Sequence, residues 1–298
     1  MAIVSQSPNR AWIEPPGVDN RAELWSKSEL AADETDASFE FIDPDNHQPS
    51  QIDLSPAQRA QFRTSFTRDQ LSVAAWSLQV GWPPAVAPDL KVIVGNNFKT
   101  SRALLPAWEG QHGRMEFPTW RVAAGKAAIT HELVHVYYPN GNRFLAEGFA
   151  IYVQALIGGN PAFPNFGRPL HAHTFDVVCD LLPEFALGRM ETLAALRVAD
   201  LERIGTPDPL ALKVGARSCG VEPYGQARLY PIAGSFTQFL IETYGLRSFR
   251  ELYARTPLLP SEKAPGNIGR WVDVYGRPFD EFEAEWKLMI ARQQPQRS

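Results

Sequence analysis

The chain of 298 residues has only two cysteines, no long apolar run and no surplus of basic residues. No stretch approaches the roughly 18 consecutive apolar residues of a transmembrane helix, so we expect no membrane span. The formal net charge of −4 argues against nucleic acid as the main partner. With 44% hydrophobic residues, the chain is long enough to bury one substantial core.

The two cysteines, Cys179 and Cys219, fit no metal-binding or redox spacing. Two free core thiols and one disulfide are both compatible with their positions. The N-terminus lacks the basic flank, apolar run and small-residue cleavage site of a signal peptide. The default expectation is therefore a cytoplasmic protein, although an exported chain whose leader has been removed would look the same.

Negative charge is concentrated in residues 1–50. This segment holds ten acidic and three basic side chains, a net charge of −7, which leaves +3 for the rest of the chain. Such an acidic, weakly periodic segment is either an irregular stretch wrapped on a domain or a disordered tail. We assign residues 51–298 to one globular domain and residues 1–50 to an acidic N-terminal segment.

Local patterns predict an α+β fold, in which a small mixed sheet is followed by a mostly helical C-terminal part. Ser55 and Pro56 indicate the start of a long amphipathic helix that ends near residue 80. Strands are expected over residues 90–94 and 113–118, the second near a sheet edge because it ends in proline. Helices are expected over residues 121–138, 143–157, 173–188, 190–204, 231–244 and 279–290.

Residues 131–135 read HELVH within an alanine-rich predicted helix. Histidines four positions apart lie on one helix face, so His131 and His135 can reach one metal ion. Glu132 lies about 100° around the helix from His131, close to the metal but poorly placed to bind it. It is therefore suited to accept a proton from a water on that metal. Taken alone, the motif fits equally well a pair of helical histidines with a surface glutamate between them.

A second segment, FLAEGFA, supplies the third ligand that a catalytic zinc needs. Glu147 lies twelve residues after His135 on the next predicted helix. The Pro-Asn-Gly turn between the two helices lets the second fold back, so that Glu147 comes near the histidines. Gly148 removes a side chain where the two helices approach. We therefore expect one Zn²⁺ per chain, held by His131, His135 and Glu147.

The pairing of HELVH with FLAEGFAIYVQ resembles the gluzincin metallopeptidases, in particular the aminopeptidase N branch and the compact peptidase MA-like domains. The resemblance is tight over residues 131–153 and loose over 113–290. It implies a thermolysin-like catalytic domain with the same three zinc ligands and with Glu132 as general base. The spacing to the third ligand is shorter than in aminopeptidase N and looks more like the peptidase MA-like group.

The resemblance extends to YPIAGSF, which begins at Tyr230. In the aminopeptidase group, a tyrosine at the start of such a helix, fifteen residues before a helix-ending glycine, stabilises the oxyanion. Tyr230 has this spacing from Gly245, which implies the same role. A packing role for this tyrosine, and Tyr224 as a competing candidate, are the alternatives.

Two further patterns carry less weight. Glu116 in GRMEF resembles the glutamate with which aminopeptidases hold a free amino terminus, but Phe117 replaces the asparagine of that motif. Exopeptidase activity is therefore not implied. His171 and His173 have no carboxylate at ligand spacing and follow a proline-rich loop, so we assign them to a loop that lines the cleft or to the surface.

Together these features predict a zinc metallopeptidase that hydrolyses peptide bonds in a peptide or protein substrate. Three alternatives stay open: a zinc hydrolase with a non-peptide substrate, a non-catalytic metal-containing binding protein, and a regulatory module whose acidic segment covers the cleft. The presence of Glu132 favours an enzyme, because a site without turnover does not need a general base.

Overall fold

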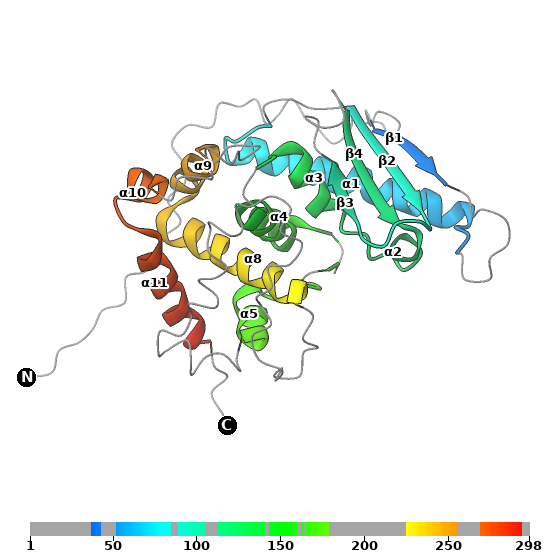
Figure 1. Cartoon of the computed structure of the whole chain (residues 1–298). Coiled ribbons are helices and arrows are strands. Elements are labelled where there is room, and N and C mark those ends of the chain that lie inside the picture. Colours follow the sequence, from blue (N-terminus) through cyan, green and yellow to red (C-terminus); the bar gives the residue numbers. More distant parts are fainter. Residues whose placement is uncertain are drawn as a thin grey trace, which may run out of the picture. The chain divides into compact units, whose positions relative to one another are not determined.

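Four short strands form a mixed sheet in the order β1-β2-β4-β3 (Figure 1). The strands are β1 (Ala37–Phe41), β2 (Asp89–Gly95), β3 (Arg102–Leu104) and β4 (His112–Pro118). β1 and β4 both run parallel to β2, whereas β3 pairs antiparallel with β4. The computed structural model describes residues 37–42, 52–84, 89–104, 112–140, 143–159, 162–163, 165–178, 225–255 and 269–293.

The rest of the described chain is mostly helical, so the fold is of the mixed α+β kind. The helices are α1 (Pro56–Gln79), α2 (Thr119–Ala123), α3 (Ile129–Tyr137), α4 (Arg143–Ile157), α5 (Leu170–Val178), α8 (Gly225–Tyr244), α9 (Leu246–Ala254), α10 (Arg270–Tyr275) and α11 (Phe279–Ala291). None of them is long and apolar enough to cross a membrane, as far as the described residues go.

One face of the sheet packs against α1 and α3. Alternate residues of a strand point to the same face, and Leu90, Val92 and Val94 of β2 are accordingly all buried in one cluster. The same cluster contains Phe66 of α1 and Leu133 of α3, both at 0% exposure. The helix that carries HELVH is therefore fixed to the sheet through its apolar residues.

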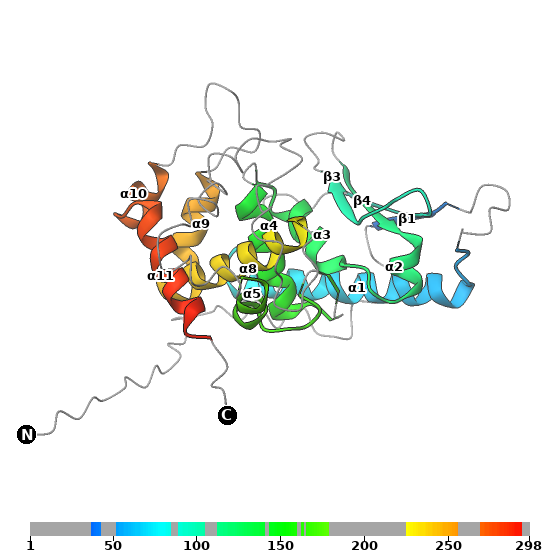
Figure 2. The same ribbon diagram turned by 60° about the horizontal axis from the view of Figure 1, so that its bottom comes forward.

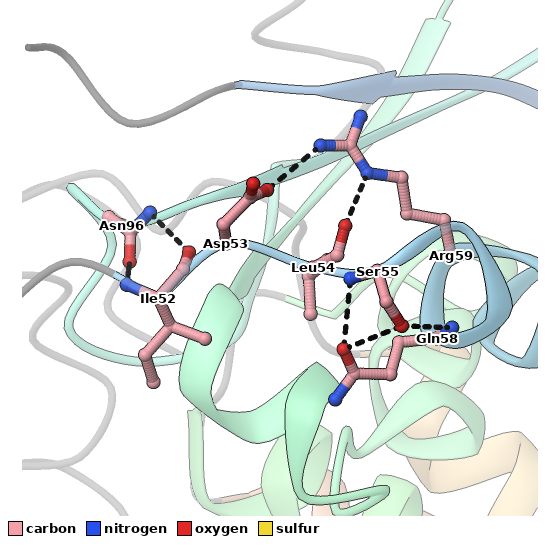
Figure 3. A network of polar contacts seen from close by, with 7 residues as sticks. All are labelled: Ile52, Asp53, Leu54, Ser55, Gln58, Arg59 and Asn96. Atoms are coloured by element: carbon pink, nitrogen blue, oxygen red, sulfur yellow. Dashed lines mark hydrogen bonds and ion pairs between the residues drawn. The ribbon is translucent and has the colours of Figure 1, made fainter.

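The long helix α1 begins at a capping box (Figure 3). The Ser55 side chain accepts a hydrogen bond from the Gln58 backbone N–H, and the Gln58 side chain accepts one from the Ser55 N–H. These contacts satisfy backbone groups that a helix start leaves without partners. Just before the cap, Ile52 exchanges two hydrogen bonds with the Asn96 side chain, both of 3.0 Å. The start of α1 is thereby tied to the segment after β2.

A second core forms among the later helices. α4 packs against α8, and α8 in turn contacts α5, α9 and α11 (Figures 1 and 2). Phe149 of α4, Phe236 of α8 and Trp271 of α10 are almost completely buried in it. Aromatic rings dominate this cluster, and their edge-to-face contacts add to the energy of apolar burial.

Two expectations about the elements need correction. β4 lies next to the edge of the sheet but is not the edge strand, since β3 pairs with its residues 114–116. Pro118 lies beyond that pairing, so its missing N–H costs no hydrogen bond to β3. The predicted helix over residues 121–138 is two helices, α2 and α3. Gly125 adopts a left-handed φ of +63° directly after α2 and ends it.

Most other predicted elements are confirmed, with α1, β2, α4 and α11 within two residues of the expected bounds. α8 begins at Gly225, earlier than expected, and contains Pro231 in its interior. β1 lies inside the segment that we assigned to the acidic N-terminus, where its alternation of apolar and polar residues (ASFEF) is the signal for a strand. The predicted helix over residues 190–204 and both cysteines lie outside the described residues, as does most of the one over 173–188.

Candidate metal centre

Three predicted ligands converge on one point. The Nε2 atom of His131 lies 3.1 Å from the Glu147 Oε2 atom, and the His135 Nε2 atom lies 3.1 Å from His131 Nε2 and 3.3 Å from the same oxygen. A tetrahedral zinc with bonds of about 2.0–2.2 Å separates neighbouring ligand atoms by roughly 3.3–3.6 Å. The three distances are close to that spacing, so the group could hold a metal ion.

The local sequence explains this convergence. His131 and His135 are one helical turn apart on α3, and Glu147 lies in the second turn of α4, which packs against α3. Gly148 follows directly and faces α8, where a Cβ atom would lie 2.5 Å from the Ala233 carbonyl oxygen. Only glycine permits this approach, so Gly148 fixes the depth at which α4 carries Glu147. The expectation that Gly148 permits a close helix contact is confirmed, but the helix that it contacts is α8 rather than α3.

The three candidate ligands are largely shielded from water, with side-chain exposures of 7% for His131, 16% for His135 and 12% for Glu147. Burial by itself would raise the pKa of Glu147. The charges of both histidines and their hydrogen bonds outweigh this and hold that pKa well below its usual range. An ionised carboxylate beside two imidazole nitrogens is a donor set that divalent transition metals and zinc accept.

Glu132 is buried beside the ligands but is not one of them. Its residue exposure is 4%, and its carboxylate has no hydrogen-bond or ion-pair partner among the described residues. Burial raises the pKa of Glu132, and the charges of His131 and His135 partly offset this effect. A carboxyl group with a raised pKa and no fixed partner is suited to accept and release a proton.

Tyr230 lies beside His131. Its ring centre is 6.2 Å from that of His131, and its ring packs edge-on against Phe163 at 5.1 Å. The structure thus brings Tyr230 to one of the candidate ligands, and its role at the oxyanion stays a prediction. The residue lies in the second turn of α8 rather than at the helix start. Tyr224, the competing candidate, is outside the described residues.

The structure adds one charged residue that the sequence analysis missed. Arg121 of α2 is near enough to Glu132 and Tyr230 for their charges to act on it. Arg121 was missed because the expected single helix over residues 121–138 would place it three turns away from Glu132. The break at Gly125 turns α2 relative to α3. Gly125, in an otherwise alanine-rich run, was the signal for that break.

Other sequence candidates lie apart from this cluster or are engaged elsewhere. Glu116 is fully buried and forms ion pairs with Arg102 and Arg114, so its charge is already neutralised. This pairing argues against a role in binding an amino terminus. His171 and His173 lie on α5 rather than in a loop, and His171 shares a hydrogen bond of 2.8 Å with Ser235 of α8.

A second polar contact supports the start of α3. The Thr130 hydroxyl, adjacent to His131, donates a hydrogen bond of 3.1 Å to Asp69 of α1. Asp69 is 3% exposed and also accepts hydrogen bonds from Arg68. Because a buried carboxylate needs such partners, this contact fixes the position of α3 on α1.

No protein-family model matches the chain, and neither a curated protein nor a solved structure matches it. In the absence of such matches, the site is classified by its geometry. In this mixed α+β fold, two histidines of one helix and a glutamate of the next form a group that could hold a metal ion.

Proposed function

We propose that the chain is a zinc-dependent peptidase with a gluzincin-type site on a thermolysin-like scaffold. The observation that carries the proposal is the convergence of His131, His135 and Glu147 beside a buried Glu132 without a partner among the described residues. A purely structural metal site would need the three ligands and usually a fourth, but it would have no use for that buried acid.

The choice of zinc rests on the ligand atoms. Two imidazole nitrogens and one carboxylate oxygen leave one position of a tetrahedron open, which is the usual composition of catalytic zinc sites. Magnesium and calcium prefer sites made of oxygen atoms alone. When bound, zinc would supply Lewis-acid activation of water and of the scissile carbonyl group.

The chain's own residues then have separate tasks. Glu132 accepts a proton from the attacking water and later delivers it to the nitrogen of the leaving amine. Tyr230 donates a hydrogen bond from its phenol to the carbonyl oxygen on which negative charge develops. The low exposure of His131 and Glu132 keeps bulk water away from these steps, which strengthens the electrostatic interactions within the site.

The test compares metal content and peptide cleavage in the wild-type chain, Glu132→Gln and His135→Ala. Elemental analysis of protein purified without added metal should find one zinc per chain in the wild type and in Glu132→Gln. Cleavage of a proteome-derived peptide library, followed by mass spectrometry, should fall at least 100-fold in Glu132→Gln, because the general base is lost. His135→Ala should lose both zinc and cleavage.

The two variants separate binding from chemistry. Wild-type cleavage rates in Glu132→Gln would contradict the assigned mechanism. If the wild type contains zinc but cleaves no library peptide, the metal site is confirmed and the proposed peptidase activity is refuted. Absence of zinc from all three proteins, even after zinc addition, would refute the metal site itself.

A further inference from the structure

Arg121 occupies an unusual position next to the candidate metal centre. Its guanidinium carbon lies 5.1 Å from the ring centre of Trp120 and 5.6 Å from that of Phe163. One of its nitrogens donates a hydrogen bond of 3.2 Å to the Ser101 hydroxyl. The side chain is thus held between two aromatic rings and a hydroxyl group.

The Phe163 ring connects Arg121 to Tyr230 and His131. Phe163 contacts Arg121 with its face and Tyr230 with an edge-to-face packing at 5.1 Å. Tyr230 in turn lies against His131. The guanidinium group is therefore on the side of the site where Tyr230 and Glu132 lie.

Arg121 differs from the other half-buried arginine of this region in its pairing. Arg114 forms an ion pair with Glu116, two residues further along the same strand, β4. Arg121 has no ion pair within the described part of the chain. Partial burial lowers the pKa of Arg121, and the charges of Glu132 and Tyr230 act in the opposite direction. The chain thus holds a partly desolvated cation with unused hydrogen-bond donors next to its reactive groups.

We propose that Arg121 binds a carboxylate of the substrate and so makes the site selective for peptides with an anionic group close to the scissile bond. The inference rests on the proposed function and specifies its substrate class. A guanidinium group presents a planar pair of N–H donors that matches the two oxygens of a carboxylate. The carboxylate is either the peptide's C-terminus or an aspartate or glutamate side chain.

The loop after α4 holds the aromatic side of this subsite in place. Buried Gln154 of α4 donates hydrogen bonds of 3.1 Å to the Phe163 carbonyl and the Asn165 side chain. Phe166, half exposed at 51%, has a left-handed φ of +51° and packs against Phe163 at 6.0 Å. A non-glycine residue adopts this conformation only where its surroundings enforce it. The Phe163 ring beside Arg121 is thus preorganised, which lowers the entropic cost of binding.

The experiment measures binding and selectivity separately. The probes are acetyl-Ala-Phe-Leu-Ala with a free C-terminus, its C-terminal amide, and the amide with Glu as the last residue. Dissociation constants are measured by calorimetry on zinc-loaded, full-length Glu132→Gln, so that no turnover is needed. We expect one of the carboxylate peptides to bind about 10- to 100-fold more tightly than the plain amide. Adding Arg121→Gln should abolish this preference.

Control variants distinguish a binding role from an effect through Glu132. Arg121→Lys keeps the charge but loses the paired donors, so it should retain only part of the preference. Arg63→Gln removes an arginine that also lies over aromatic rings, those of Phe39 and Phe41 on β1, and it should change nothing. Preference for the free C-terminus identifies the terminal carboxylate as the ligand, and preference for the glutamyl amide identifies a side chain.

Three results would overturn the inference: equal affinity for all peptides, no measurable binding of any peptide, or a preference that survives Arg121→Gln. In the library assay, an equal loss of cleavage for acidic and neutral sites in Arg121→Gln would point to an effect on Glu132 instead. If carboxylate peptides bind preferentially but the wild type cleaves none, the proposed peptidase activity is refuted and the role of Arg121 in binding a carboxylate is retained.

Discussion

His173 shows how a single buried side chain can make stability depend on pH. The residue is 7% exposed, and its Nδ1 atom has no hydrogen-bond partner within the described part of the chain. Burial lowers the pKa of His173, and the nearby charge of Arg168 lowers it further, while Asp176 acts in the opposite direction. The folded state therefore favours the neutral imidazole, whereas the unfolded chain takes up a proton at pH values below about 6.5.

The free energy of unfolding should accordingly fall as the pH drops below about 6.5. Between pH 7.5 and 5.5, His173 accounts for a loss of up to about 1.4 kcal/mol. We expect His173→Asn to show a smaller decrease over this interval than the wild type, by that amount at most. Urea unfolding at the two pH values measures the difference. An identical pH dependence in both proteins would contradict the assignment.

The candidate ligands could be predicted because their geometry is local. His131 and His135 are related by one helical turn, and Glu147 lies on the next helix, so spacing alone brings the three together. Arg121 and Phe163 could not be predicted in this way. Their positions depend on a helix break and on a loop conformation that long-range contacts enforce.

The crossing of α4 and α8 depends on two small residues. A Cβ atom at Gly148 would meet the Thr237 hydroxyl and, at 2.5 Å, the Ala233 carbonyl oxygen. A Cβ atom at Gly234 on α8 would meet the Ile151 side chain at 2.5 Å instead. A carbonyl oxygen of a helix cannot move away alone, whereas a side chain can adjust its rotamer.

Gly148→Ala should therefore separate the two helices and displace Glu147. We expect a loss of about 1–3 kcal/mol in unfolding free energy, together with weaker zinc binding. Gly234→Ala serves as the comparison and should weaken zinc binding less, because its Cβ atom meets the Ile151 side chain rather than the backbone of the facing helix. Denaturant unfolding and zinc titration against a chelator measure both quantities. Equal effects of the two substitutions would show that the approach of α4 to α8 does not control the ligand position.

Helices with clear start and stop signals were predicted, whereas β3, which is defined by pairing, and the short helices α9 and α10 were not. α1 has a capping box, and α4 lies between glycine- and proline-containing turns, so their bounds follow from the sequence. β3 has only three residues and is stabilised by its hydrogen bonds to β4. Its short segment carries no periodic pattern, because the partner strand rather than its own side chains selects the conformation.

The candidate metal centre joins the two hydrophobic cores of the described chain. α3 contributes Ile129, Leu133 and Val136 to the core under the sheet, while α4 contributes Phe149 and Val153 to the helical core. A metal ion held by both helices acts as a cross-link between these cores. Its binding free energy then stabilises the folded chain as a whole.

Zinc removal should therefore lower the melting temperature. At a free zinc concentration 1,000 times the dissociation constant, binding contributes about 4 kcal/mol, which corresponds to roughly 10 °C for a chain of this size. Differential scanning calorimetry with zinc and with a chelator measures the shift. His135→Ala should melt at the same temperature under both conditions. A zinc-dependent shift of equal size in His135→Ala would place the stabilising ion elsewhere.

The short interval from His131 to Glu147 also has a kinetic consequence. Contacts between residues close in sequence form early in folding, because little chain entropy is lost in closing a short loop. The metal-binding half of the site is complete once two consecutive helices have formed. The half with Arg121, Phe163 and Tyr230 requires segments from three distant parts of the chain. During synthesis, the two histidines and Glu147 would thus come together while α8 is still being made, before Tyr230 can join Arg121 and Phe163.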